Sequence, residues 1–164
     1  MTDPACLLAA YDQQLRTDAE TAGAVATTRQ GPLHLATFLG GRGFITYQNL
    51  AGADADAIRR LVSDALAHYR ADPDIVRVEW KTRGHDHTPG LHQALLRNGF
   101  VPDEPESIMI GEARALATDV APPETVTLRT VTTEADVRAM SAMQDEVFGQ
   151  AVSAEAANAL LRTR

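Results

Sequence analysis

The stretch DADAIRRLVSDALAHYRADPDIVRVEWKT, residues 54–82, indicates the fold class. Its first half repeats apolar side chains at i, i+3, i+4 and i+7, which predicts a helix over residues 54–70 with one buried stripe. That stripe consists of Ile58, Leu61, Val62, Ala65, Leu66 and Tyr69. The second half, after Asp72-Pro73, predicts a largely buried strand over residues 75–82, with bulk supplied by Ile75, Val76, Val78 and Trp80.

The residues before this stretch predict one helix and an antiparallel meander. Asp3-Pro4 offers an N-cap acceptor followed by proline at the first helical position. Gly31-Pro32 separates two β-prone runs, since proline removes a ladder donor and favours a turn. The glycine-rich stretch over residues 40–43 is interpreted as a strand connection and not a phosphate loop, because a strand follows it and not a helix. The predicted elements are a helix over residues 4–16 and strands over residues 24–30, 33–39 and 44–47.

The residues after the stretch predict a short helix and a hairpin. Thr88-Pro89 opens the helix, and Asn98-Gly99 closes it with a left-handed C-cap. The turn-rich residues 102–105 stand between β-prone residues 100–101 and 107–112, which predicts a final β-hairpin. The whole pattern predicts an α/β (α+β) fold with a mixed, mostly antiparallel sheet flanked by helices.

The carboxyl-terminal part reads as a linker and an incomplete second domain. Pro122-Pro123 lies in a stretch without periodicity, which is typical of a linker. The expected organisation is a first domain over residues 1–116, a linker over residues 117–125 and the start of a second domain over residues 126–164. That start comprises a strand over residues 126–131, a helix capped by Thr133 with Val137, Met140 and Val147 facing inward, and a helix that begins at Ser153. Because segments below about 40 residues rarely fold alone, this part is expected to dock, to swap with another chain or to begin a longer domain.

Composition excludes several classes of function. The formal net charge of -7 and the absence of basic runs argue against nucleic-acid partners. Cys6 is the single cysteine, so no disulfide framework or thiolate metal cluster is expected, and we interpret it as a passive thiol. The amino terminus fits no signal peptide and no apolar run reaches the roughly 20 residues of a membrane span, which predicts a cytoplasmic protein.

Four motifs carry a resemblance to the GNAT superfamily of acyl-CoA N-acyltransferases. They are Gly43-Phe-Ile-Thr-Tyr47, Glu79-Trp-Lys-Thr82, Gly84-His85-Asp86 and Gly99-Phe-Val-Pro-Asp-Glu-Pro-Glu106. As a set they resemble tandem GNAT proteins of the actinobacterial type. The run over residues 126–149 looks like the first strand and first helix of a second GNAT domain. The resemblance implies that the complete protein transfers an acetyl group from acetyl-CoA to a small-molecule amine.

The resemblance also implies where acetyl-CoA would bind. Family members use a loop of pattern Gln/Arg-x-x-Gly-x-Gly/Ala before a helix, whose backbone N–H groups hold the pyrophosphate. The matching stretch here is residues 50–56, which has one glycine and places Asp54 and Asp56 where the pyrophosphate would sit. We therefore predict that this chain alone binds no cofactor and lacks transferase activity.

The densest polar cluster consists of His85, Asp86, His87 and His92, with Glu79 on the preceding strand. Zinc needs three or four converging ligands, and one loop offers at most two here, so no metal site is predicted. We interpret the cluster as a solvated loop. The functional alternative is that Glu79, His85, Asp86 and His87 line a substrate groove.

Two further pairs of residues are candidates for a functional site. The resemblance places Glu146 and Phe148 where the family shapes its acceptor site, while their structural reading is the end of a helix before Gly149. Tyr47 and Glu79 have the chemistry of an acid and a base, but without a cofactor loop Tyr47 is expected to pack and Glu79 to lie on a polar strand face. No catalytic residue is assigned.

Two functional hypotheses result. The first is the amino-terminal portion of a GNAT-family N-acetyltransferase. The second is a non-catalytic interaction module that forms a homodimer through the incomplete second domain, whose predicted strand over residues 126–131 would offer an unpaired edge.

Overall fold

The computed structural model describes residues 3–16, 18–117, 119–149 and 151–162. The chain divides into two compact units, Met1–Leu116 and Ala117–Arg164. The described residues form six α-helices, one 3-10 helix and one sheet of four strands. The mixed α/β (α+β) fold predicted from the sequence is confirmed.

The sheet of the first unit has the order β1-β2-β3-β4. Its strands are β1 (Ala26–Gln30), β2 (Leu33–Phe38), β3 (Arg42–Tyr47) and β4 (Arg77–Trp80). The first three form the predicted antiparallel meander, whereas β4 is parallel to β3, with Arg42 opposite Arg77 and Ile45 opposite Trp80. A helix connects the two parallel strands, as parallel pairing requires.

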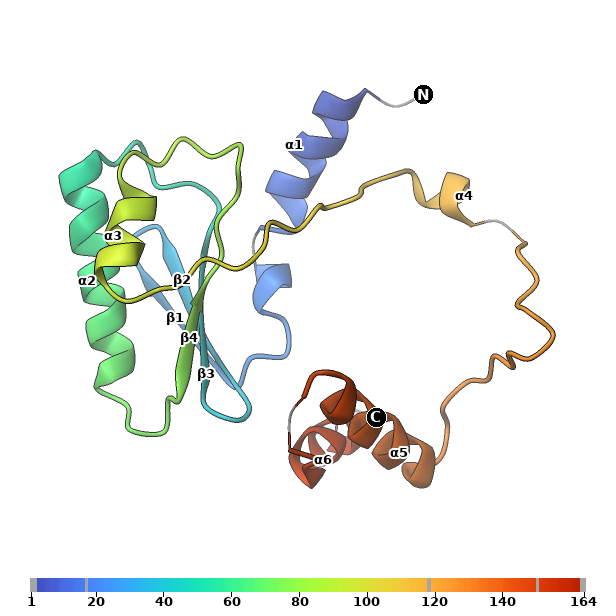
Figure 1. Ribbon diagram of the computed structural model, residues 1–164. Helices are drawn as coiled ribbons and strands as arrows, with labels where there is room; N and C mark the ends of the chain where they lie inside the picture. The colour runs from blue at the N-terminus through green and yellow to red at the C-terminus, as the bar shows by residue number, and fades with distance from the viewer. Residues whose placement is uncertain (1–2, 17, 118, 150, 163–164) are drawn as a thin grey trace. The chain divides into compact units, whose positions relative to one another are not determined.

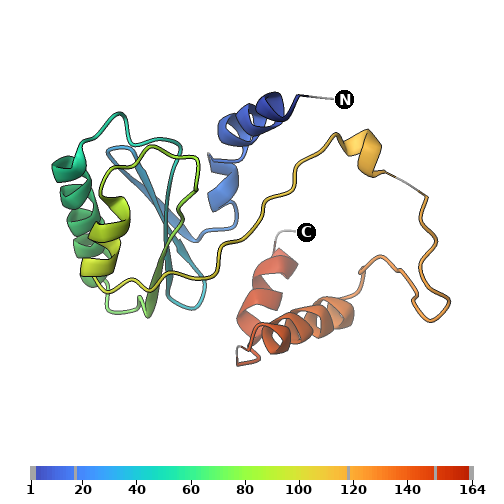
Figure 2. The same ribbon diagram turned by 45° about the horizontal axis from the view of Figure 1, so that its top comes forward.

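The helices lie on both sides of this sheet. In both ribbon views α2 (Ala55–Arg70) and α3 (Leu91–Arg97) cover one face, while α1 (Pro4–Gln14) and the 3-10 helix η1 (Asp18–Thr21) lie on the other side (Figures 1 and 2). Asp3 caps α1 through a 3.1 Å bond from the Ala5 amide, and Asp54 caps α2. The predicted helices over residues 4–16 and 54–70 are therefore confirmed.

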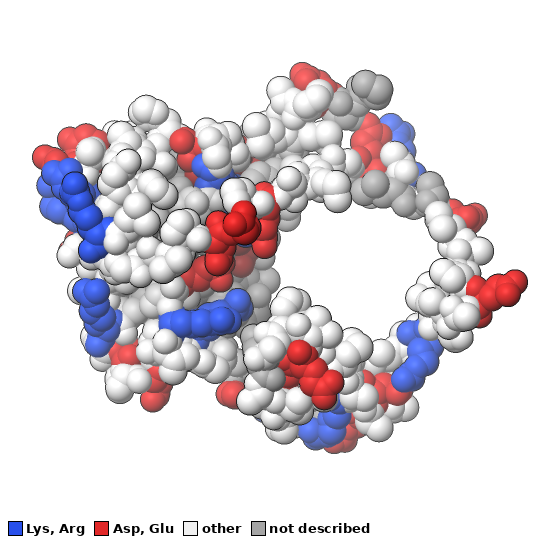
Figure 3. Space-filling model, in the orientation of Figure 1, with Lys and Arg blue, Asp and Glu red and all other residues white. Residues whose placement is uncertain are grey.

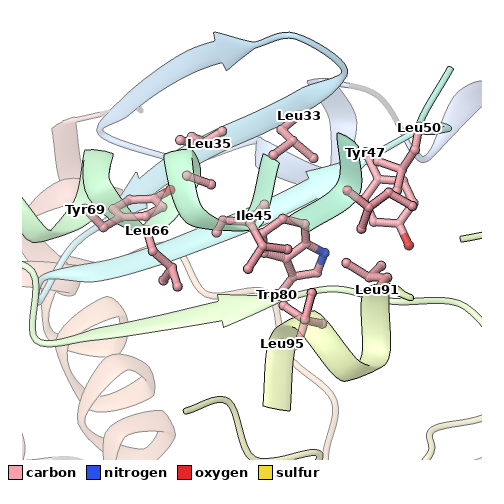
Figure 4. Packing of buried hydrophobic residues seen from close by; sticks show 14 residues of the cluster. Leu33, Leu35, Ile45, Tyr47, Leu50, Leu66, Tyr69, Trp80, Leu91 and Leu95 are labelled. Carbon is pink, nitrogen blue, oxygen red and sulfur yellow. The ribbon is translucent and has the colours of Figure 1, made fainter. Parts of the chain in front are cut away.

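The core lies between the sheet and the α2–α3 layer (Figure 4). Its members come from β2, β3, β4, α2 and α3, and include Leu33, Leu35, Ile45, Tyr47, Ile58, Val62, Leu66, Tyr69, Trp80, Leu91 and Leu95. The whole stripe predicted within residues 54–70 faces this core. Leu61 is partly buried, and the other members are buried. The 3.6-residue period thus identified the buried face of α2 correctly.

Tyr69 at the end of α2 fastens the helix to the sheet. Its hydroxyl lies 2.8 Å from the carbonyl oxygen of Ala36 and 3.0 Å from that of Phe44, and it accepts a bond from the Phe44 amide at 3.3 Å. Its ring passes so close to Gly43 that an added Cβ would lie 2.8 Å from Cε1. Because Gly43 has no Cβ, it leaves room for the ring of Tyr69.

The carboxyl-terminal end of α3 was predicted correctly and its start was not. Gly99, with φ +88°, donates to Leu96, and the Phe100 amide donates to Leu95 at 3.2 Å, which is the Schellman pattern. The helix begins at Leu91 rather than at Thr88-Pro89. Gly90 in the left-handed region explains the later start, because a left-handed residue cannot continue a right-handed helix.

Two predictions about strands in the first unit were wrong. The strand over residues 75–82 was expected to be largely buried, but in β4 only Trp80 is buried and Val76 before it is 76% exposed. β4 is an edge strand of the described sheet, and Ile75 and Val78 pack against the core without being fully buried. The hairpin over residues 100–101 and 107–112 is absent, and these residues form no strand. The described sheet places no strand beside residues 107–112, and a strand forms only with a neighbour.

The second unit contains two packed helices, α5 (Glu134–Val147) and α6 (Ala154–Arg162), and follows the short α4 (Ala113–Leu116) of the first. Thr133 caps α5 by accepting the Asp136 amide at 3.1 Å, as predicted. The Ser153 amide donates to Asp145 at 3.0 Å just before α6. The helix predicted from Ser153 is confirmed.

Two predictions about the second unit were also wrong. Residues 126–131 form no strand, and within the described chain no neighbouring strand lies beside them to supply a ladder. Of the three residues expected to face inward, only Val137 is buried, while Met140 is 37% and Val147 73% exposed. The buried residues of α5 are instead Val137, Ser141 and Asp145. Asp145 faces α6 because its carboxylate accepts the Ser153 amide just before that helix.

Candidate functional site

Six charged or ionisable side chains meet near the carboxyl-terminal end of β3. We call them the buried ionic cluster: Asp12, Arg16, Glu20, Arg83, His85 and Asp86. They come from two segments, namely residues 12–20 at the end of α1 and in η1, and residues 83–86 in the loop that follows β4. The side chains of Arg16 and Arg83 are only 2% and 3% exposed. Buried cations require partners, which explains why carboxylates surround both.

Arg16 forms the first half of the cluster. Its two terminal nitrogens each lie 2.8 Å from one oxygen of Asp86, in a bidentate arrangement, and Nη1 also lies 2.8 Å from Asp12. Nη2 donates to the carbonyl oxygen of Tyr47 at 3.2 Å. Partial burial opposes ionisation of Asp12, but hydrogen bonds from Arg16 and His85 outweigh it and lower the pKa of Asp12.

Arg83 forms the second half. Its Nε donates to the Tyr11 hydroxyl at 3.3 Å and Nη1 to the Thr46 hydroxyl at 3.1 Å, while Nη2 pairs with Glu20. Thr46 also donates to Glu20. Arg83 therefore ties the loop after β4 to α1, η1 and β3 at once.

Tyr47 lies between the two guanidinium groups. The centre of its ring is 5.7 Å from Cζ of Arg16 and 5.9 Å from Cζ of Arg83, within the range of cation–π contacts. Burial, followed by the nearby Asp86 carboxylate, raises the pKa of Tyr47. Its phenol stays protonated at neutral pH, which agrees with the interpretation of Tyr47 as a packing residue.

The cluster occupies the point where β3 and β4 separate. Their pairing ends at Ile45 and Trp80, with one further bond from the Lys81 amide to the Ile45 carbonyl at 2.9 Å. Beyond it, Arg83 contacts the hydroxyl of Thr46 and Arg16 contacts the carbonyl of Tyr47. The guanidinium groups of Arg83 and Arg16 thus contact β3 just beyond the end of its pairing with β4. The arrangement is suited to cross-linking segments and holds no activated nucleophile.

The turn from β3 to α2, residues 50–56, has a backbone suited to a tight bend. Ala51 and Gly52 have φ values of +53° and +71°. The side chain of Asp54 accepts the Ala57 amide at 2.8 Å, and Asp56 pairs with Arg59 in the first turn of α2. A carboxylate of the chain itself therefore holds an amide at the helix N-terminus, the kind of group that binds anions.

A groove of about 1020 Å³ runs beside β4 in the first unit. We call it the β4 groove. It is lined by all of β4, by the loop over residues 81–86, by Leu91, Leu95 and Phe100, and by part of residues 101–110. Trp80 and Phe100 meet edge to face on its apolar side, with ring centres 6.3 Å apart.

The groove brings together three of the site residues predicted from the sequence. Glu79, His85 and Asp86 line it, whereas His87 is exposed and does not. Glu79 lies on the polar face of β4, as expected. His85 is 3.1 Å from Asp12 and 3.3 Å from Arg16, so it belongs to the buried ionic cluster as well. No set of three metal-ligating side chains converges in the described parts of the chain.

Glu146 and Phe148 lie at the carboxyl-terminal end of α5 in the second unit. Both are exposed, Phe148 at 69%, and Phe148 is the C-cap residue of the helix. Their structural reading, the end of a helix before Gly149, agrees with this position. Their role in an acceptor site stays a prediction.

Sequence reasoning missed Asp12, Glu20 and the two arginines of the buried ionic cluster. One signal was available, because Asp12 and Arg16 are four residues apart, the spacing of a helical ion pair. Arg83 and Glu20 carry no such signal, since 63 residues separate them from each other and 72 separate Arg83 from Tyr11. Only the tertiary structure identifies them.

Comparison of this chain with models of known protein families, with curated protein sequences and with solved structures gives no match. Among the described helices, none combines the length and the apolar character that crossing a bilayer requires.

Proposed function

We propose that this chain is the amino-terminal portion of a GNAT-type N-acetyltransferase, and that its first unit supports a substrate groove without binding acetyl-CoA. The observation that carries the proposal is the connectivity of the sheet. An antiparallel meander leads through the turn at residues 50–56 into α2, and α2 leads into a strand parallel to β3. The GNAT-like order of strand, helix, strand, helix and strand is present here as far as its second helix, with the turn between β3 and α2, whereas the described residues after α3 form no strand.

Two features support the absence of a cofactor site in this unit. The first is Asp54, whose carboxylate takes a helix amide and adds negative charge where a pyrophosphate would bind. The second is the pair Arg16 and Arg83, which contact β3 just beyond the end of its pairing with β4. A thioester could enter there only by displacing two buried ion pairs, at a cost of several kcal/mol.

Thermal unfolding with and without acetyl-CoA tests this proposal. We expect no change in Tm for this chain at millimolar acetyl-CoA. A longer product of the same reading frame with a Gln/Arg-x-x-Gly-x-Gly/Ala loop should be stabilised by roughly 2.7 kcal/mol at a ligand concentration of 100 Kd. A clear rise in Tm for this chain itself would contradict the proposal, as would a longer product that carries the loop and gains nothing.

A second candidate function is a non-catalytic interaction module that pairs with a second copy. It is favoured by the exposed apolar residues of the second unit, of which Leu128 is 78%, Val147 73% and Phe148 69% exposed. Residues 126–131 also form no strand in the described chain. Light scattering across a concentration series distinguishes the two functions, because a module of this kind is dimeric and loses its dimer when Leu128 is replaced by Asp.

A further inference from the structure

The outer edge of β4 is open. In the described residues β4 pairs with β3 alone, and the bonds at its ends, from Val76 to Gly41 and from Lys81 to Ile45, also run toward β3. The backbone groups on its other edge therefore have no strand partner. An open edge of this kind is a template for an added strand.

The β4 groove lies along this edge and offers an apolar surface. Trp80, Phe100 and Leu95 supply large apolar side chains to it. The indole N–H of Trp80 is buried, the residue being 8% exposed, and finds no acceptor among the described residues. Figure 4 shows this nitrogen on the side of the ring that faces Leu91, another residue of the groove. The groove thus offers apolar area, beside a buried donor that has no acceptor in the described chain.

The rim of the groove is acidic. Glu79, Asp103, Glu104 and Glu106 line it and are exposed. Figure 3 shows acidic side chains gathered over the segment that follows α3. Of the lining cations, Arg83 is held by Glu20 in the buried ionic cluster. That leaves Arg77, and Lys81 at 4.0 Å from Glu106, to offset the four carboxylates. The rim therefore attracts a cationic partner.

We propose that the β4 groove binds an extended basic segment of another protein, which adds to the sheet as a strand beside β4. Backbone bonds to the free edge would supply affinity. Alternate side chains would meet the apolar floor and the acidic rim and supply specificity. Backbone bonds and alternate side-chain contacts are the two elements of recognition by strand addition. The volume of about 1020 Å³ is at the upper end of the range for small-molecule sites, about 300–1,000 Å³, and suits a peptide. This inference does not depend on the proposed acetyltransferase function.

A fluorescein-labelled heptapeptide of alternating valine and lysine, Val-Lys-Val-Lys-Val-Lys-Val with blocked ends, is the probe for fluorescence anisotropy with the full chain. We expect saturable binding that weakens as salt rises, because the rim contributes through charge. A peptide with glutamate in place of lysine should bind at least roughly tenfold more weakly. A peptide N-methylated on the amides of one edge should lose a similar factor, since it cannot donate to β4.

Two double variants of equal charge separate this site from general attraction to an acidic protein. Glu104→Gln with Glu106→Gln removes two carboxylates of the rim, and we expect a several-fold loss of affinity. Asp119→Asn with Glu124→Gln removes two exposed carboxylates that do not line the groove, and should change little. Absence of binding, equal losses in both variants, or full binding of the N-methylated peptide would each overturn the proposal.

Discussion

Arg16 and Asp86 are joined by two parallel hydrogen bonds of 2.8 Å, although 70 residues separate them in the chain. The pair connects the end of α1 to the loop after β4, and Asp12 and His85 complete its surroundings. This contact holds α1 against the point where β3 and β4 diverge. It therefore links the amino-terminal helix to the β4 groove, whose lining includes Asp86 and Tyr11.

Replacing Arg16 tests how much this contact stabilises the first unit. Arg16→Gln leaves Asp86, which is 10% exposed, without its main partner. We expect a loss of about 3 kcal/mol in the free energy of unfolding, the lower end of the range for a broken buried pair, because Asp12 and Asp86 keep some contact with solvent. Urea denaturation at neutral pH measures it.

The matched control is Arg59→Gln, which removes the same charge from an exposed pair with Asp56. Its effect should stay within about 1 kcal/mol, as for surface ion pairs. Equal losses in the two variants would show that the buried cluster contributes no more than a surface contact.

Gly43→Ala tests the close packing of α2 on the sheet. The new Cβ would lie 2.8 Å from Cε1 of Tyr69, so the ring must move and its hydroxyl bonds to Ala36 and Phe44 must lengthen. Overpacking of this kind costs about 1–3 kcal/mol. Gly84→Ala is the control, since its Cβ meets nothing within 4 Å and its φ is not positive. A Gly43 variant as stable as the Gly84 variant would refute the packing argument.

The lowered pKa of His34 predicts a loss of stability in mild acid. Burial, and then the neighbouring Arg29, lower the pKa of His34 below its ordinary value of 6.5, against the opposing pull of Asp18 and Glu20. Below pH 6.5 the unfolded chain therefore binds a proton that the folded chain does not. The free energy of unfolding decreases as the pH is lowered from 6.5, and this decrease ends once the pH is below the folded pKa. Above 6.5 the imidazole is neutral in both states and its contribution is complete.

The measurement compares urea denaturation at pH 7.5 and pH 5.5 for the wild type and His34→Gln. The stability lost between the two pH values should be smaller in the variant, because glutamine does not titrate there. An identical loss in both proteins would remove His34 as the source.

The carboxyl group of Asp136, in the second unit, is expected to have an unusually low pKa. Hydrogen bonds from Arg129 and then Thr133 lower the pKa of Asp136 from 3.8 to about 2. The interaction favours the start of α5 above pH 3.8 and is lost as pH falls toward 2. An NMR titration of the carboxyl carbon should give a midpoint near 2 in the wild type and a higher one in Arg129→Gln. Arg138→Gln, on the same helix but paired with Glu134, should leave the midpoint in place.

The sequence by itself determined the elements whose signals are local. The stripe of α2, the cap at Asp3, the break at Gly31-Pro32 and the C-cap at Gly99 each depend on residues within one or two turns of each other. For the same reason the meander and the cap of α5 by Thr133 could be predicted. Local periodicity and turn chemistry are sufficient for such elements.

Only the tertiary structure decided what depends on distant partners. Residues 107–112 and 126–131 have strand-like composition but form no strand, because a strand needs a neighbour and the described sheet places none beside them. Glu79 and His85 were found from the sequence, whereas Arg83 and Glu20 were not, since ion pairing between segments far apart leaves no trace in local sequence. The order of amino acids set the period of each element, and packing between elements decided which edges stayed open and which charges were buried.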